Sequence, residues 1–182
     1  RKAEAIAQKA KDELEEYVKS IPSIIRKTAD ELDLAPGQTR WEAAQLEALS
    51  NNVALSPWHR IGPFGEGDLK KAHERAFINE TEVDMKRTHG NLKWELAENL
   101  EDGNQHQLTG ANCSTYLFRT IHSSIAQERE LSIGSDDSFK IWINGKLVAD
   151  KYVSRGLAPN QDKVKVRLAK GENKLLFKVS NG

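Results

Sequence analysis

Three short runs near the C-terminal end of the chain, residues 139–143, 163–168 and 174–179, carry an apolar residue at every second position. Successive residues of a β-strand point to opposite faces of a sheet, so each run predicts a strand with one face turned to a core. A helix would scatter the same residues around its circumference. The apolar positions are Phe139, Ile141 and Ile143, then Val164, Val166 and Leu168, then Leu175, Phe177 and Val179.

The residues between these runs favour tight turns. Asn144-Gly145 predicts a two-residue hairpin, because a type I′ turn needs positive φ at both central positions. Gly171-Glu-Asn173 predicts a second turn. We expect further strands at 58–64, 92–97, 114–123, 128–134 and 146–148, with a long polar connection over 65–90. The fold class predicted is mainly β, an antiparallel β-sandwich of jelly-roll type, because many short strands are joined by turns.

The first part of the chain follows a helical period instead. Apolar residues recur at three- and four-residue spacing before Pro22, and Thr39-Arg-Trp-Glu42 has the pattern of a capping box that opens a further helix. Trp41 in this box is expected to pack that helix onto the sandwich. We therefore expect an N-terminal α-helical arm or linker over 1–54 and a β-sandwich domain over 55–182.

Composition excludes several classes of protein. Among 182 residues, Lys+Arg and Asp+Glu both number 27, and a nucleic-acid binder would carry a basic excess. Apolar runs are too short for membrane insertion. The single cysteine, Cys113, cannot form an internal disulfide and is expected to be a small buried group. Because the chain starts at Arg1 with residues of helical character, we expect a piece of a longer protein.

Four segments together resemble the galactose-binding-like jelly-roll modules, among them the N-terminal sugar-binding domains of β-galactosidase-type glycosidases. They are Trp58 with Ile61-Gly-Pro-Phe64, Gly134-Ser-Asp-Asp137, Ile141-Trp-Ile-Asn-Gly-Lys146, and Leu168-Ala-Lys-Gly-Glu-Asn-Lys-Leu-Leu-Phe-Lys-Val179. Arg155-Gly-Leu-Ala-Pro-Asn-Gln-Asp162 is similar to an element of domains in large exported bacterial proteins, some of which carry c-type haem modules. The resemblance covers the last ~125 residues and not the arm.

The resemblance implies a non-catalytic accessory module of a larger exported bacterial protein, located outside the cytoplasm, in the periplasm or secreted. Its partners would be a glycan ligand and neighbouring domains of the parent chain. The alternative is a purely structural or protein-interaction module that docks those neighbouring domains. The sequence has no Gly-x-Ser-x-Gly elbow, phosphate loop or Cys-x-x-Cys-His, so no enzyme activity is expected of this part of the protein.

Asp136-Asp137 is the first candidate site, at a corner between two expected strands. Ca²⁺ takes six to eight oxygen ligands, and two adjacent carboxylates can supply part of such a shell, which in some adhesin-type sugar-binding domains also holds sugar hydroxyls. The competing interpretation is turn chemistry, in which Asp accepts hydrogen bonds from backbone amides. A glycosidase dyad is disfavoured, because its two carboxyls must flank the scissile bond from opposite sides.

Trp142 is the second candidate. If its neighbours face the core, its ring faces outward, where it can stack on a sugar. The competing interpretation is that the helical arm covers this face. Trp58 and Trp94 are expected in the core.

Arg155 is the third candidate. It can pair with Asp162 and pin the loop between them, or grip an acidic sugar or a sulfate. The histidines lack zinc spacing, although His73 and His89 can join Glu80, Glu82 or Asp84 around a metal; solvated loop residues are the expectation.

Overall fold

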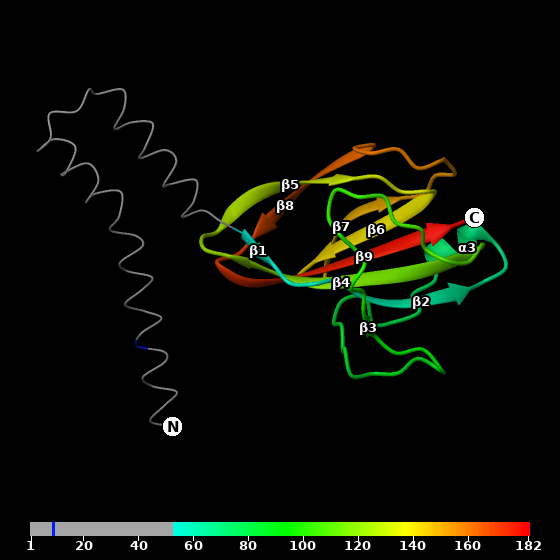
Figure 1. Cartoon of the computed structure of the whole chain (residues 1–182), viewed down its shortest axis with the longest axis horizontal. Helices are drawn as coiled ribbons and strands as arrows, with labels where there is room; N and C mark the ends of the chain where they lie inside the picture. The colour runs from blue at the N-terminus through cyan, green and yellow to red at the C-terminus, as the bar shows by residue number, and fades with distance from the viewer. Residues whose placement is uncertain (1–8, 10–52) are drawn as a thin grey trace, which may run out of the picture. The chain divides into compact units, whose positions relative to one another are not determined.

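The computed structural model describes residue 9 and residues 53–182, and the latter form one compact unit, Val53–Gly182. This unit is mainly β, with antiparallel strands, as the alternation predicts (Figure 1). The helical arm, its capping box and Trp41 lie outside the described residues, apart from positions 53 and 54, which belong to a strand. Among the described residues, no helix has the length and apolar character needed to cross a membrane.

Two sheets make up the unit. The larger has the strand order β3-β2-β4-β9-β6-β7, with β1 also paired to β4, and the smaller consists of β5 and β8. The strands are β1 Val53–Leu55, β2 His59–Gly65, β3 Glu95–Leu96, β4 Cys113–Ser123, β5 Gln127–Ile133, β6 Ser138–Ile143, β7 Lys146–Lys151, β8 Asp162–Leu168 and β9 Gly171–Asn181. One short helix, α3 Leu69–Glu74, follows β2.

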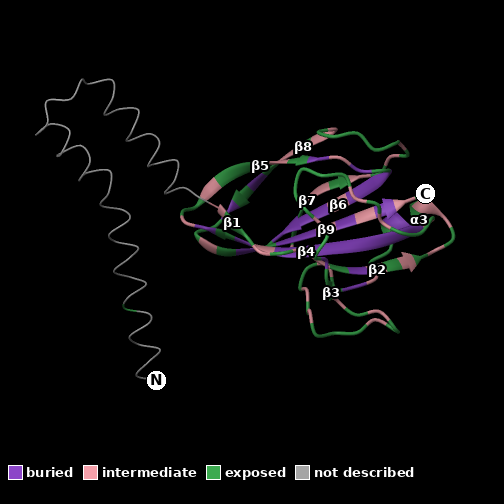
Figure 2. Cartoon of the chain, in the orientation of Figure 1, coloured by how far each residue is buried: buried purple, intermediate pink, exposed green. Residues whose placement is uncertain are grey.

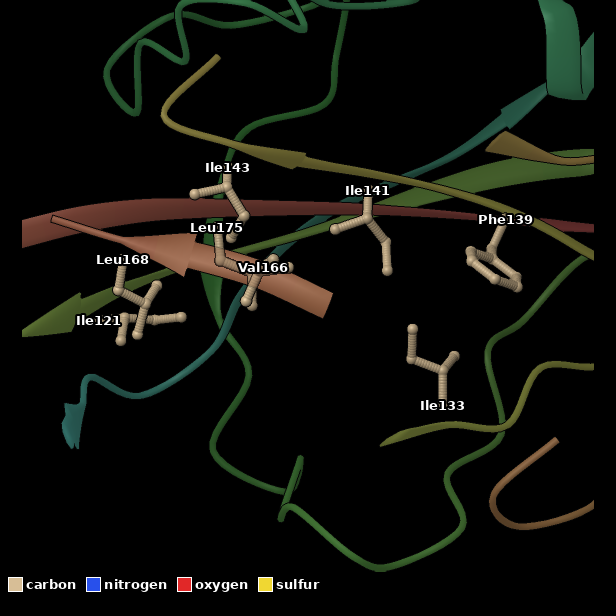
Figure 3. Packing of buried hydrophobic residues seen from close by; sticks show 8 residues of the cluster. All are labelled: Ile121, Ile133, Phe139, Ile141, Ile143, Val166, Leu168 and Leu175. Atoms are coloured by element: carbon tan, nitrogen blue, oxygen red, sulfur yellow. The ribbon is translucent and has the colours of Figure 1, made fainter. Parts of the chain in front are cut away.

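The core lies between the two sheets. The larger sheet supplies apolar side chains from β4, β6 and β9, and the smaller supplies side chains from β5 and β8 (Figure 3). The buried members are Ile121, Ile133, Phe139, Ile141, Ile143, Val166, Leu168 and Leu175. The alternating positions of β6, β8 and β9 therefore face this core as predicted, because burial of one face selects the register of each strand.

The opposite face of the larger sheet is also covered. Residues 66–94, here called the covering segment, connect β2 to β3 and contribute apolar side chains to a second cluster on this face. That cluster comprises Ile61, Ile78, Tyr116, Phe118, Trp142 and Leu176, with Phe64, Phe77, Val83, Met85, Leu92 and Trp94 packed against it. As a result β4, β6 and β9 are buried over most of their length (Figure 2).

Local details follow the expected turn chemistry with two differences. Asn144 and Gly145 have φ of 51° and 77°, which confirms the hairpin between β6 and β7. The turn expected at Gly171–Asn173 is displaced, because β9 already begins at Gly171. Helix α3 was not predicted; Asp68 caps it by accepting a hydrogen bond from the amide of Lys71 at 2.8 Å.

Candidate functional site

The Asp136–Asp137 corner is a backbone junction. Asp137, which is 7% exposed and has φ of 61°, accepts hydrogen bonds from the amide of Arg155 at 2.8 Å and from the amide of Gly182 at 2.6 Å. Its carboxylate thus joins three segments of chain, as turn chemistry requires. Asp136 is exposed beside it. The described residues contain no group of three His, Cys, Asp or Glu side chains able to hold a metal, so the corner does not assemble a calcium shell there.

Arg155 lies at the same corner. Its guanidinium donates to the hydroxyl of Ser135 at 2.8 Å and pairs with Asp162, whose side chain is 13% exposed. Lys151 also donates to Asp162. Burial raises the pKa of Asp162, but the hydrogen bonds from Lys151 and Arg155 outweigh it and hold that pKa below its usual value. The structure therefore joins Arg155 to the Asp137 corner as a pin for the 153–162 loop.

Trp142 corrects the sequence prediction. Its ring does point to the face opposite the core, but it is only 4% exposed. It packs in the second cluster with Leu176 and Phe118, beneath apolar side chains of the covering segment such as Ile78. The prediction of a ring open to solvent is wrong, because residues 77–85 carry apolar side chains without a period and so gave no sign of covering a sheet. Trp142 cannot stack on a sugar from solvent.

Lys178 anchors the covering segment from below. Its side chain, 0% exposed, donates to the carbonyls of His73 at 2.8 Å and Arg75 at 2.6 Å, and its ammonium lies 3.6 Å from the carboxylate of Glu80. Tyr116 donates to the same carboxylate at 2.6 Å. Burial lowers the pKa of Lys178 to about 8 despite the charge of Glu80. One β9 side chain therefore ties three positions of the covering segment to the sheet.

His73 forms a second buried contact. Its Nε2 lies 2.8 Å from Asp150, and Asp150 is also 3.3 Å from the ammonium of Lys140. The other ring nitrogen, Nδ1, is buried and has no partner among the described residues. Burial lowers the pKa of His73, although Asp150 opposes that shift. His73 is thus a neutral structural histidine, and it does not meet His89, Glu82 or Asp84 at a metal site.

A hollow of about 420 Å³ opens on the covering segment beside Trp94. Trp94 is half-buried, with its ring set edge-to-face against Phe118 at 5.9 Å between ring centres. The expectation that Trp94 belongs to the core is met for one side of its ring, while the residue also lines the hollow. Polar residues surround it: Asn79, Glu82, Asp84, Arg87, His89 and Lys174.

The charged residues of this hollow are not spent on one another. Within the described part of the chain, Glu82, Arg87 and Lys174 have no ion-pair partner, and the indole N–H of Trp94 donates no hydrogen bond. Asp84 instead accepts from the amide of Lys86 at 2.9 Å and shapes the local turn. The site combines an accessible aromatic ring with unpaired donors and acceptors. Sequence reasoning missed it, and the unusual length of the 65–90 connection was the available signal.

Trp58 likewise has a partly core position. It packs against the main core, while its indole donates to Asp102 at 3.1 Å and the guanidinium of Arg119 lies 4.4 Å above its ring centre. Arg119 also bonds both oxygens of Asp102, at 2.9 and 2.7 Å. Cys113 is buried with a free thiol, which confirms its expected role as a small buried group.

No known protein-family model matches this chain, and no curated protein matches it. Among solved structures the chain is similar to a β-glucuronidase of Faecalibacterium prausnitzii, with 14% identity and a TM-score of 0.36. The similarity covers 71% of this chain and 21% of the β-glucuronidase chain, so the chain spans about a fifth of that protein's length. At this TM-score the similarity is too weak to support a statement about fold or function.

Proposed function

We propose that residues 55–182 form a non-catalytic accessory module, a jelly-roll sandwich of the galactose-binding-like kind, that binds carbohydrate for a larger exported bacterial protein. The observation that carries this proposal is the hollow beside Trp94. Its volume of about 420 Å³ falls among the roughly 300–1,000 Å³ of small-ligand sites.

The chemistry of the hollow suits a polyhydroxylated ring. The apolar C–H face of a sugar can lie on the indole of Trp94, which is large, rigid and able to donate one hydrogen bond. Sugar hydroxyls both donate and accept, so they can use the carboxylate of Glu82 and the guanidinium of Arg87 together. Because these groups are unpaired within the described residues, no internal ion pair has to break before a ligand binds.

The absence of a reaction is part of the proposal. A glycosidase needs a carboxylic acid and a carboxylate on the two sides of the bond, about 5–10 Å apart. Asp137 is committed to two backbone amides and Glu80 to Tyr116 and Lys178, so neither carboxylate is free for such chemistry. The carboxylates of the hollow, Glu82 and Asp84, are exposed, and their pKa values have no buried environment to raise them.

A glycan array followed by titration calorimetry tests the proposal. The full chain is expected to bind at least one class of oligosaccharide, and Trp94→Ala to weaken that binding at least about tenfold, as for an aromatic residue central to a binding site. Trp94→Phe keeps a ring and should retain part of the affinity.

Tyr152→Ala is the matched control. Tyr152 is another accessible aromatic, 56% exposed, but it does not line the hollow. Its removal should leave binding unchanged. Equal binding by wild type and Trp94→Ala, or no binding to any glycan on a broad array, would contradict the proposal.

A structural or docking role is the second candidate. It is favoured by β7, an edge strand of the larger sheet, where Leu147 is 45% exposed and the following Tyr152 is 56% exposed. An open strand edge with exposed apolar side chains can pair with a neighbouring domain. Slower amide exchange across β7 in the parent protein than in this chain alone would favour docking, and equal exchange would count against it.

A further inference from the structure

A second, smaller cavity lies where the pairing of β2 with β4 is interrupted. Ile61 pairs with Tyr116 and Phe64 with Ser114, so Gly62 and Pro63 bulge out and Thr115 has no partner residue on β2. Gly62 is needed there, because its φ is 137° and a Cβ would lie 3.0 Å from the carbonyl oxygen of Ser114. Bulges of this kind are enriched next to binding sites, since they end the pairing and re-aim side chains.

The floor of the cavity offers a hydroxyl with nothing to bond. Thr115 lines the cavity and is 7% exposed, and its hydroxyl makes no hydrogen bond to any described residue. Buried polar groups are nearly always satisfied, so an unpaired hydroxyl at the base of an open cavity points to a partner from outside the chain. Ile61, 1% exposed, completes the floor.

The rim supplies positive charge. Arg60 and Lys93 both line the cavity, both are exposed, and neither has an ion-pair partner in the described residues. Glu95 lines it as well and faces Arg60 across the β2–β3 pairing, yet the two form no ion pair, so the charged lining has one net positive charge. Asn91 and Thr109 add further hydrogen-bonding groups.

Size restricts what can enter. The volume of about 150 Å³ corresponds to roughly five water molecules at about 30 Å³ each. A carboxylate or sulfate group fits with the atoms that carry it, whereas an oligosaccharide does not. Arg, Lys and hydroxyl donors together are the usual recognition set for such oxyanions.

We propose that this cavity binds a small oxyanion, the carboxylate or sulfate substituent of an acidic glycan, between the cations of Arg60 and Lys93 and the hydroxyl of Thr115. The choice of a glycan as the carrier rests on the proposed function; the oxyanion site itself does not. The turn in which His89 and Leu92 exchange backbone hydrogen bonds of 2.8 and 3.1 Å contributes His89 to the Trp94 hollow and Leu92 to this cavity. One ligand can therefore reach both.

The first test uses inorganic sulfate and the full chain. Sodium sulfate is titrated against sodium chloride at equal ionic strength, followed by amide NMR shifts. Wild type should show saturable shifts concentrated at Arg60, Lys93 and Thr115, and the double variant Arg60→Gln/Lys93→Gln should weaken the affinity at least about tenfold. Thr115→Val, a change of similar shape, should weaken it without altering the remaining spectrum. Lys165→Gln, whose side chain is 74% exposed on β8, should bind as wild type does.

Shifts that do not saturate, or that are the same in wild type and the double variant, would overturn the oxyanion site. The second test compares an acidic oligosaccharide with its neutral counterpart of the same backbone. Tighter binding of the acidic form, with the preference lost in Arg60→Gln/Lys93→Gln, supports the glycan as carrier. Equal binding of both forms overturns the acidic ligand while the carbohydrate-binding function stands. Saturable sulfate binding without binding of any glycan supports the oxyanion site and overturns the proposed function.

Discussion

Replacing Lys178 by methionine removes the ammonium that holds the covering segment on the larger sheet. The variant leaves the carbonyls of His73 and Arg75 without their donor and Glu80 without its buried cation. Removing one partner of a buried ion pair costs about 3–5 kcal/mol, because the other partner stays buried and uncompensated. We expect Lys178→Met to lower the free energy of unfolding of the full chain by that amount, measured by urea unfolding followed by tryptophan fluorescence.

The pH dependence of stability provides a second, independent signature of the same residue. Burial lowers the pKa of Lys178 from its ordinary 10.5 to about 8. Between these values the unfolded chain binds the proton and the folded chain does not, so stability rises with pH. At about 1.4 kcal/mol for each pKa unit, the rise between pH 7 and pH 10 is roughly 2–3 kcal/mol. Burial raises the pKa of Tyr116, which reverses the sign only above its ordinary value of 10.0.

Two controls separate Lys178 from other lysines. Lys174→Met changes a neighbouring, exposed lysine on β9 and should alter stability by no more than about 0.5 kcal/mol. Lys178→Met should also lose the rise in stability between pH 8 and pH 10. The reasoning is refuted if Lys178→Met is as stable as wild type, or if the same rise persists in the variant.

Three further changes test other parts of the fold, each measured as thermal unfolding of the full chain. Gly145→Ala should destabilise by about 1–3 kcal/mol, because a Cβ there would lie 2.3 Å from the carbonyl oxygen of Thr81 and φ is 77°; a neutral effect would show that the covering segment does not contact the hairpin. Trp142→Ala should cost about 3–5 kcal/mol as a core truncation, whereas a change under 1 kcal/mol would mean an exposed ring. Asp162→Asn should lower stability at pH 7 but have little effect near pH 2, since the depressed pKa of Asp162 contributes stability that is lost as pH falls; an equal loss at both pH values would contradict this.

The strands and their inward faces could be predicted from the sequence. Phe139, Ile141 and Ile143 lie in the core between the sheets, as the alternation of the run requires. Such prediction works because the two-residue period of a strand is a local property, and a shift of one residue would expose every apolar side chain. The Asn144-Gly145 turn is local for the same reason.

The predicted sites fared less well, because each depends on what lies across from it. Asp137 and Arg155 do meet at one corner, but the partners that occupy them, the amide of Gly182 and the carboxylate of Asp162, come from later in the chain. Trp142 was placed on the correct face and given the wrong environment. Its cover is irregular chain, and irregular chain has no period from which burial can be predicted.

The sequence by itself therefore determined the antiparallel strands, their apolar faces and the hairpin, all of which follow from the spacing of neighbouring residues. Tertiary structure alone decided that the covering segment closes over Trp142, that Lys178 is buried beneath it, and that Trp94 keeps one side open in a polar hollow. These outcomes depend on contacts between positions as distant as His73 and Lys178. Burial and charge pairing are properties of the assembled surface, so the candidate binding sites emerged only when the chain had folded.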